Sequence, residues 1–119
     1  MNRFKNIDLR KPTMKASKYR NVKVEVDGVK FHSKKEAKRY GELKMLEKAG
    51  LIEELELQPK FEIWAYGTKI CSYISDFRYV EDGTTIVEDV KSEETKKLPV
   101  YRLKIKLLKA IYGIEIKEI

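Results

Sequence analysis

The feature that most constrains this chain is a pair of strongly β-forming runs joined by a tight turn. Residues 70–80 and 84–91 are rich in β-branched and aromatic side chains. Asp82-Gly83 between them is a two-residue turn signal, because both central positions of such a turn need a positive φ angle. The pattern predicts an antiparallel hairpin, around which the rest of the chain must be arranged.

Acidic side chains fall in the middle of both strands of this hairpin. Because side chains alternate between the faces of a strand, Asp89 shares a face with Lys91, and Glu88 points to the opposite face. Buried carboxylates are costly unless they are paired, and Mg²⁺ is commonly held by one or two carboxylates with waters and a phosphate. The spacing therefore predicts either a metal site of Asp76 and Asp89 beside Lys91, or an exposed ion pair of Asp89 and Lys91.

The remaining pattern predicts a mixed α/β domain, with a central mixed β-sheet flanked by helices. Residues 1–18 lack hydrophobic periodicity and are expected to form a flexible basic arm, followed by a single domain over residues 19–119. The elements expected in that domain are a β-hairpin over 22–31, a helix over 33–49, strands over 51–57 and 61–66, the hairpin over 70–91, a helix over 97–112 and a closing strand over 114–119. The inward-facing residues expected in the second helix are Val100, Leu103, Leu107, Ala110 and Ile111.

Composition narrows the class of protein. The single cysteine, Cys71, excludes an internal disulfide and a cysteine-rich zinc site. No apolar run approaches the roughly 18 residues that span a bilayer, and no export signal opens the chain. We therefore expect a cytoplasmic protein, in the host cytoplasm if phage-encoded, with no membrane contact and no small-molecule cofactor.

Charge is segregated along the chain. Residues 1–20 carry seven Lys/Arg and one acid, residues 95–119 carry seven Lys/Arg and two acids, and the segment between them is acidic. Two basic ends around an acidic middle suit a protein that grips a polyanion and keeps carboxylates for a metal, although a lysine-rich surface with a basic tail would look similar. The arm residues expected to contact DNA are Lys15, Lys18 and Arg20.

The acidic residues follow the order of a known motif. Asp76 precedes Asp89-Val90-Lys91 by 12 intervening residues, within the segments YISDF (73–77) and IVEDVKS (86–92). This arrangement resembles the PD-(D/E)xK nuclease superfamily, and especially its small phage-encoded members, Holliday-junction resolvases and transposase nuclease subunits. Ser75 stands where the pattern usually has proline. The resemblance covers residues 19–112 and implies a restriction-endonuclease-like fold.

Three further residues have both a functional and a structural interpretation. Glu36 falls where the superfamily places an acid on the preceding helix, yet Ser33-Lys-Lys-Glu36 also fits a helix capping box. Glu88 replaces Asp89 as a ligand if a β-bulge exchanges their faces. Gln58 either orients a metal-bound water or is a sheet-edge amide. Lys104 and Tyr101, with Arg102 and Lys106, are expected to contact phosphates from the second helix, unless they form a solvated basic face.

Together these features predict a Mg²⁺- or Mn²⁺-dependent DNA endonuclease of recombination, repair or DNA processing. Asp76 and Asp89, with Glu36, would hold the metal, and Lys91 would stabilise developing negative charge. Cutting both strands symmetrically would require a homodimer. The alternatives are a non-catalytic DNA-binding module on the same fold and a phage protein-interaction factor. The preferred DNA structure does not follow from the sequence.

Deleting residues 1–18 is expected to weaken DNA binding without unfolding the domain, because the deletion removes six basic residues and phosphate contacts dominate non-specific affinity. Fluorescence anisotropy over a series of salt concentrations measures the effect. The truncated chain should show a shallower salt dependence than the full chain, and an unchanged affinity would remove the arm from the binding surface.

Overall fold

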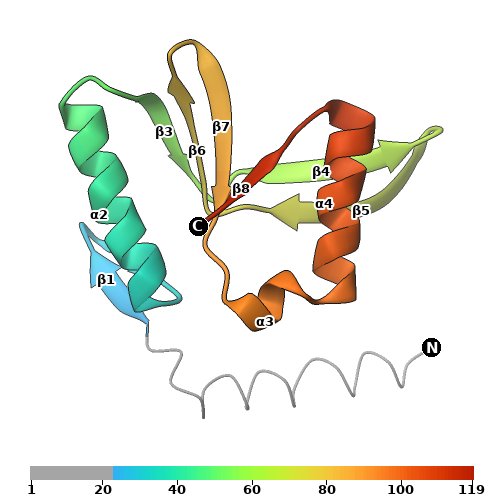
Figure 1. Cartoon of the computed structure of the whole chain (residues 1–119), viewed down its shortest axis with the longest axis horizontal. Helices are drawn as coiled ribbons and strands as arrows, with labels where there is room; N and C mark the ends of the chain where they lie inside the picture. Colours follow the sequence, from blue (N-terminus) through green and yellow to red (C-terminus); the bar gives the residue numbers. More distant parts are fainter. Residues whose placement is uncertain (1–22) are drawn as a thin grey trace. The chain divides into compact units, whose positions relative to one another are not determined.

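The computed structural model describes residues 23–119, so the arm and its Lys15, Lys18 and Arg20 lie outside the described residues. The chain divides into two compact units, Met1–Lys38 and Arg39–Ile119. The described elements, labelled in Figure 1, are β1 (Val24–Val26), β2 (Val29–Phe31), α2 (Lys34–Lys48), β3 (Glu53–Leu57), β4 (Lys60–Ala65), β5 (Thr68–Ile74), β6 (Phe77–Glu81), β7 (Thr84–Asp89), α3 (Glu93–Lys96), α4 (Pro99–Tyr112) and β8 (Ile116–Glu118).

The described part of the first unit holds the expected hairpin and the start of α2. Strands β1 and β2 pair antiparallel around Asp27-Gly28, both of which have positive φ angles. The backbone N–H of Glu36 donates to Ser33 Oγ at 3.1 Å, which caps the helix. The local signals for this hairpin and for the helix start are confirmed.

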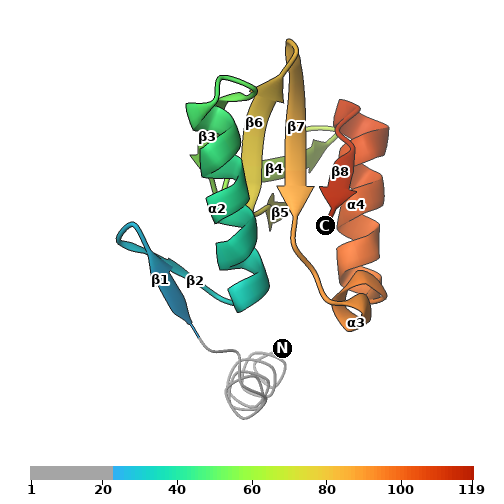
Figure 2. The ribbon, with the colours of Figure 1, turned by 60° about the vertical axis from the view of Figure 1, so that its left-hand side comes forward.

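The second unit is built on a four-stranded sheet with the order β3-β6-β7-β8, visible in Figure 2. The pairs β3–β6 and β6–β7 are antiparallel, whereas β8 runs parallel to β7. Strands β4 and β5 form a separate antiparallel hairpin. The predicted mixed α/β class is therefore confirmed, with one difference: residues 70–80 form two strands instead of one, because β5 pairs with β4 and β6 pairs with β3 and β7.

Helix α4 packs on the β4–β5 hairpin through a small core. It begins with Pro99 at its first position and ends at Gly113, whose φ of 70° closes the helix in the left-handed conformation. The buried residues that form this core are Ile63, Tyr73, Tyr101 and Leu108.

The predicted inward face of α4 is wrong except for Leu107, which is partly buried and packs against the core. Val100, Leu103 and Ile111 are exposed, and Ala110 is exposed as well, whereas Tyr101 and Leu108 are the buried residues of the helix. The helix carries two apolar stripes, and periodicity alone does not tell which of them meets the sheet. No helix in residues 23–119 is both long and apolar enough to cross a membrane.

Leu108→Ala is expected to lower the free energy of unfolding by about 2–5 kcal/mol, because Leu108 is fully buried and its loss leaves a cavity. Leu103→Ala is the matched control on the same helix, since Leu103 is 57% exposed, and it should cost much less. Urea unfolding of both variants measures the difference. Equal losses would mean that the packed face of α4 has been misassigned.

Candidate functional site

Two strand pairs separate from each other at one point of the second unit. Gln58-Pro59 joins β3 to β4, and Ser75-Asp76 joins β5 to β6 directly opposite. The Gln58 N–H donates to the Asp76 carbonyl at 2.9 Å, and the Ser75 N–H donates to the Pro59 carbonyl at 3.1 Å. These bonds keep the backbone paired while the β4–β5 hairpin leaves the sheet.

Gln58 takes part in this junction through its backbone. Its φ of 52° is left-handed, which is uncommon for a residue other than glycine and turns the chain sharply. Its side chain is exposed. The position supports a structural role in the bend, and the water-orienting role expected of Gln58 stays a prediction.

Asp76 is held against the end of β7 from two directions. Its N–H donates to the Glu88 carbonyl at 3.1 Å, and its Oδ2 accepts a 2.7 Å hydrogen bond from the Val90 N–H. The carboxylate of Asp76 is thus fixed beside the backbone of the residue that follows Asp89. Asp76 is therefore bonded to the residues on either side of Asp89, at the end of β7.

Asp89 is fully buried, and its two oxygens have different surroundings. The Tyr73 hydroxyl donates to Oδ2, while Oδ1 lies 3.4 Å from Lys91 Nζ and accepts no hydrogen bond in the part of the chain that the structure describes. Burial raises the pKa of Asp89 to about 6, against the opposing effect of Lys91, and the nearby charge of Glu118 adds to the increase. A buried carboxylate whose pKa is shifted by burial and by a specific charged neighbour is a candidate for a functional site.

Glu118 is a neighbouring acid that sequence reasoning missed. Strand β8 pairs Glu118 with Asp89, and the Tyr101 hydroxyl donates to Glu118 Oε2 at 2.6 Å. The rings of Tyr101 and Tyr73 lie 6.4 Å apart, so two adjacent phenols donate to two adjacent carboxylates. Only the strand order reveals this arrangement, since the sequence shows Glu118 merely as an acid in a basic terminal segment.

The position of Tyr101 corrects its predicted role. It is 8% exposed, and its hydroxyl is engaged with Glu118, so it lies in the core and not on a phosphate-contacting surface. Arg102 and Lys106 are exposed on α4, and Lys104 is half-buried. The helix has no acidic residue between Pro99 and Tyr112, and Lys109 pairs with Glu115 beyond its end. The phosphate contacts expected of Arg102, Lys104 and Lys106 stay a prediction.

Glu88 lies on the opposite face of β7 from Asp89, as alternation predicts. Arg39 donates to both of its oxygens, from Nε at 2.8 Å and from a terminal nitrogen at 2.5 Å, and the Tyr79 hydroxyl donates as well. Burial opposes ionisation of Glu88, but these hydrogen bonds outweigh it and lower its pKa. The carboxylate is committed to Arg39, so its geometry does not support Glu88 as a substitute for Asp89.

Glu36 is buried in the first unit and completes a variant of the capping box. Its Oε1 accepts a 3.2 Å hydrogen bond from the His32 N–H, one residue earlier than the Ser33 N–H of the usual motif. The structural interpretation of Glu36 is therefore confirmed. Its metal role stays a prediction.

The acidic pair fits a divalent cation only in part. No group of three or more acidic, histidine or cysteine side chains in residues 23–119 is arranged to hold a metal. Mg²⁺, however, commonly uses one or two carboxylates and completes its shell with water and phosphate. Asp89 and Asp76 suit that mode of binding, in which water and phosphate complete the shell of the ion. Residues 23–119 do not supply enough ligands to enclose an ion with protein atoms alone.

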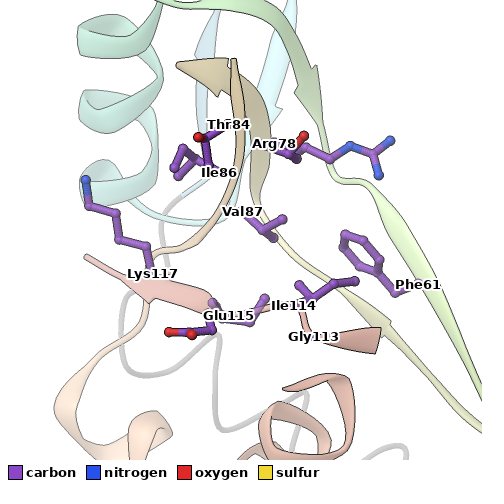
Figure 3. Close-up of a pocket in the computed structure, with 11 residues that line it drawn as sticks. Phe61, Arg78, Thr84, Ile86, Val87, Gly113, Ile114, Glu115 and Lys117 are labelled. Atoms are coloured by element: carbon purple, nitrogen blue, oxygen red, sulfur yellow. The ribbon is translucent and has the colours of Figure 1, made fainter. Parts of the chain in front are cut away.

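A separate open pocket of about 600 Å³ lies between β7 and the segment 113–117. It forms because β8 pairs with β7 only from Val87 onward, which leaves the start of β7 uncovered. Figure 3 shows Val87, Ile114 and Phe61 around this pocket. Neither Asp76, Asp89 nor Lys91 lines it, so the pocket and the acidic site are distinct.

Asp89→Asn is expected to stabilise the protein at neutral pH in the absence of metal. The folded state binds the Asp89 proton more tightly than the unfolded chain, so this group costs stability as the pH rises from about 4 to about 6 and remains costly above that range. Removing the charge should raise the free energy of unfolding by about 2 kcal/mol at neutral pH and change it little near pH 4.

Urea unfolding at both pH values measures this effect, with Asp82→Asn in an exposed turn as the control. A gain of equal size at both pH values would show that ionisation of Asp89 is not its cause.

Comparison with known proteins gives a family assignment. The family described as "Protein of unknown function (DUF1064)" matches residues 16–117. No curated protein and no solved structure matches the chain. The match covers the β1–β2 hairpin, the junction, the acidic pair and α4, and the chain belongs to the DUF1064 family.

Proposed function

We propose that this protein is a metal-dependent DNA endonuclease that hydrolyses phosphodiester bonds. The observation that carries the proposal is the buried Oδ1 of Asp89 beside Lys91. The Asp76 carboxylate is bonded to the N–H of Val90, the residue that follows Asp89. A carboxylate buried at a cost to stability, beside a lysine and in the same junction as Asp76, is typical of a site that does chemistry. The order Asp76, Asp89, Lys91 on a β-hairpin matches the pattern of the PD-(D/E)xK superfamily.

The mixed sheet supports the restriction-endonuclease-like fold expected from that resemblance. Side chains on β7 project to both faces, with Glu88 contacting Arg39 of α2 and Asp89 contacting Tyr73 of the β4–β5 hairpin, on which α4 packs. The acidic pair therefore lies where β7 leaves the sheet, and the following segment leads directly into α3 and α4. The basic residues of α4 therefore follow the acidic pair along the chain, after the short helix α3.

Asp76 and Asp89 would hold Mg²⁺ or Mn²⁺. When bound, such an ion lowers the pKa of a water and neutralises charge on the scissile phosphate. Tyr73 fixes the orientation of Asp89 by donating to Oδ2, which leaves Oδ1 to face Lys91. Lys91 would orient the attacking water and stabilise negative charge on the phosphate, and Arg102, Lys104 and Lys106 would bind the DNA backbone.

Asp76→Asn and Lys91→Ala are each expected to lower cleavage of a supercoiled plasmid by about 100-fold or more, because each removes charge from the reacting centre. DNA binding, measured without metal, should remain near the wild-type value. Asp82→Asn is the matched control, since asparagine suits the same two-residue turn, and it should cut normally.

The same assay separates the alternatives. Salt-sensitive DNA binding with no Mg²⁺-dependent cutting by the wild type would leave a non-catalytic DNA-binding module. No interaction with DNA would favour a protein-interaction factor. Cutting at the wild-type rate by Asp76→Asn would show that the site has been misassigned. The homodimer expected for symmetric cleavage is checked by sedimentation of the protein with and without DNA.

A further inference from the structure

Helix α4 carries a second apolar stripe on the face that it turns away from the core. Val100 and Leu103 are 65% and 57% exposed. Ala110 and Ile111 continue the stripe toward the end of the helix, and Leu107 lies half-buried at its inner edge. The helix lies on the outside of the second unit in Figures 1 and 2. A single exposed apolar residue needs no explanation, but a row of them along about three helical turns marks a contact surface.

The spacing of this stripe is that of a helix pair. Val100, Leu103, Leu107 and Ala110 follow each other at steps of three, four and three positions. These steps are the a and d positions through which two helices pack side by side. Such a seam is narrower than the apolar face of a helix that packs in a core, and it holds no tryptophan or phenylalanine of the kind that helices commonly insert into a membrane surface. The partner that fits the stripe is therefore another helix.

The residues that flank the stripe are cations. With Val100 and Leu103 as a and d, Lys104 and Lys106 take the e and g positions, whose charges select the partner in a helix pair. No acid in the part of the chain that the structure describes forms an ion pair with either of these lysines. Lys109, farther from the seam, does pair with Glu115. The two lysines beside the stripe thus lack the opposite charge that a partner helix would supply.

These lysines also argue against the occupants that the chain itself could supply. A second copy of α4 would bring lysines against lysines, because the helix has no acidic residue. Residues 1–20 carry seven Lys/Arg and one acid, so they have the same sign of charge as the helix. Phosphates of a nucleic acid would pair with the lysines but would leave the apolar stripe uncovered. An acidic amphipathic helix covers the stripe and pairs with both flanks.

We infer that α4 docks an amphipathic helix of a partner protein, with apolar residues in its seam and acidic residues on both flanks. This inference goes beyond the proposed function and does not depend on it, since Val100 and Leu103 have no part in binding DNA or metal. Lys104 and Lys106 belong to both proposals, so the variant that decides the inference lies in the apolar stripe.

The test measures, by fluorescence anisotropy, how the full chain binds two labelled synthetic peptides of about 21 residues, or about three heptads. Both peptides have leucine at the a and d positions. One has glutamate and the other has lysine at the e and g positions, so neither pairs with itself. The wild type is expected to bind the acidic peptide at least about tenfold more tightly, because two cations exchange an attraction for a repulsion in the basic one. Circular dichroism should show that the acidic peptide gains helix on binding.

Leu103→Asp should weaken binding of the acidic peptide by about tenfold or more, because it places a charge in the seam. Met45→Asp is the matched control, since Met45 is 72% exposed on α2, and it should bind the peptide as the wild type does. The double variant Lys104→Glu/Lys106→Glu should prefer the basic peptide. Misfolding would weaken binding of both peptides and would not reverse the preference.

Three results with the peptides would overturn the inference: no binding of either peptide, equal affinity for the two, or an unchanged affinity in Leu103→Asp. Flotation with vesicles of phosphatidylcholine and phosphatidylglycerol, without peptide binding, would replace the partner helix by a membrane surface if Leu103→Asp abolishes it. A dimer in sedimentation that Leu103→Asp abolishes would replace it by a second copy. None of these results bears on cleavage by Asp76, Asp89 and Lys91, so the proposed function is tested separately.

Discussion

The backbone of Asp76 holds the second unit together at the point where its two strand pairs separate. Its N–H bonds to Glu88 and its carbonyl to Gln58, so it contacts the strand ends on both sides. Unpaired backbone groups are costly away from water, and these bonds satisfy them while the chain bends. The same residue bonds through its side chain to Val90. The junction that shapes the fold is therefore also the place where the acidic residues meet.

Glu88 and Asp89, adjacent residues of β7, are both buried, but their surroundings shift their pKa values in opposite directions. Glu88 is paired with Arg39 and Tyr79, and these hydrogen bonds lower its pKa in spite of burial. Asp89 accepts a hydrogen bond from Tyr73 on one oxygen and has only an ion pair with Lys91 at 3.4 Å on the other, and burial raises its pKa. A fully bonded buried ion pair is explained by structure, although it adds little net stability. A buried carboxylate with an oxygen left over is explained better by a ligand, which is why the proposal rests on Asp89.

Helix α4 connects the candidate site with the outer part of the β4–β5 hairpin. Tyr101 near its beginning donates to Glu118, beside Asp89, and Tyr112 at its end bonds to the β4–β5 hairpin. Between these two attachments the helix itself carries no acid, and Lys109 pairs with Glu115 beyond its end.

The sequence by itself determined the features that depend on neighbouring residues. The turns at Asp27-Gly28 and Asp82-Gly83, the end of α4 at Gly113 and the opposite faces of Glu88 and Asp89 all follow from local backbone rules, and the structure has them. The capping of α2 by Ser33 belongs to the same group. Each of these features is decided within a few residues, so a single chain is enough to predict it.

Tertiary structure alone decided which distant residues meet. The placement of β8 beside β7 brings Glu118 to Asp89, and Arg39 reaches Glu88 across 49 positions of sequence. Residues 70–80 are split near Asp76 because β5 pairs with β4 and β6 pairs with β7. The Tyr101 face of α4 is buried because it packs on the β4–β5 hairpin. Strand order and helix rotation are set by the packing of the whole unit, and periodicity holds no information about either, because two faces or two neighbours can satisfy the same local pattern.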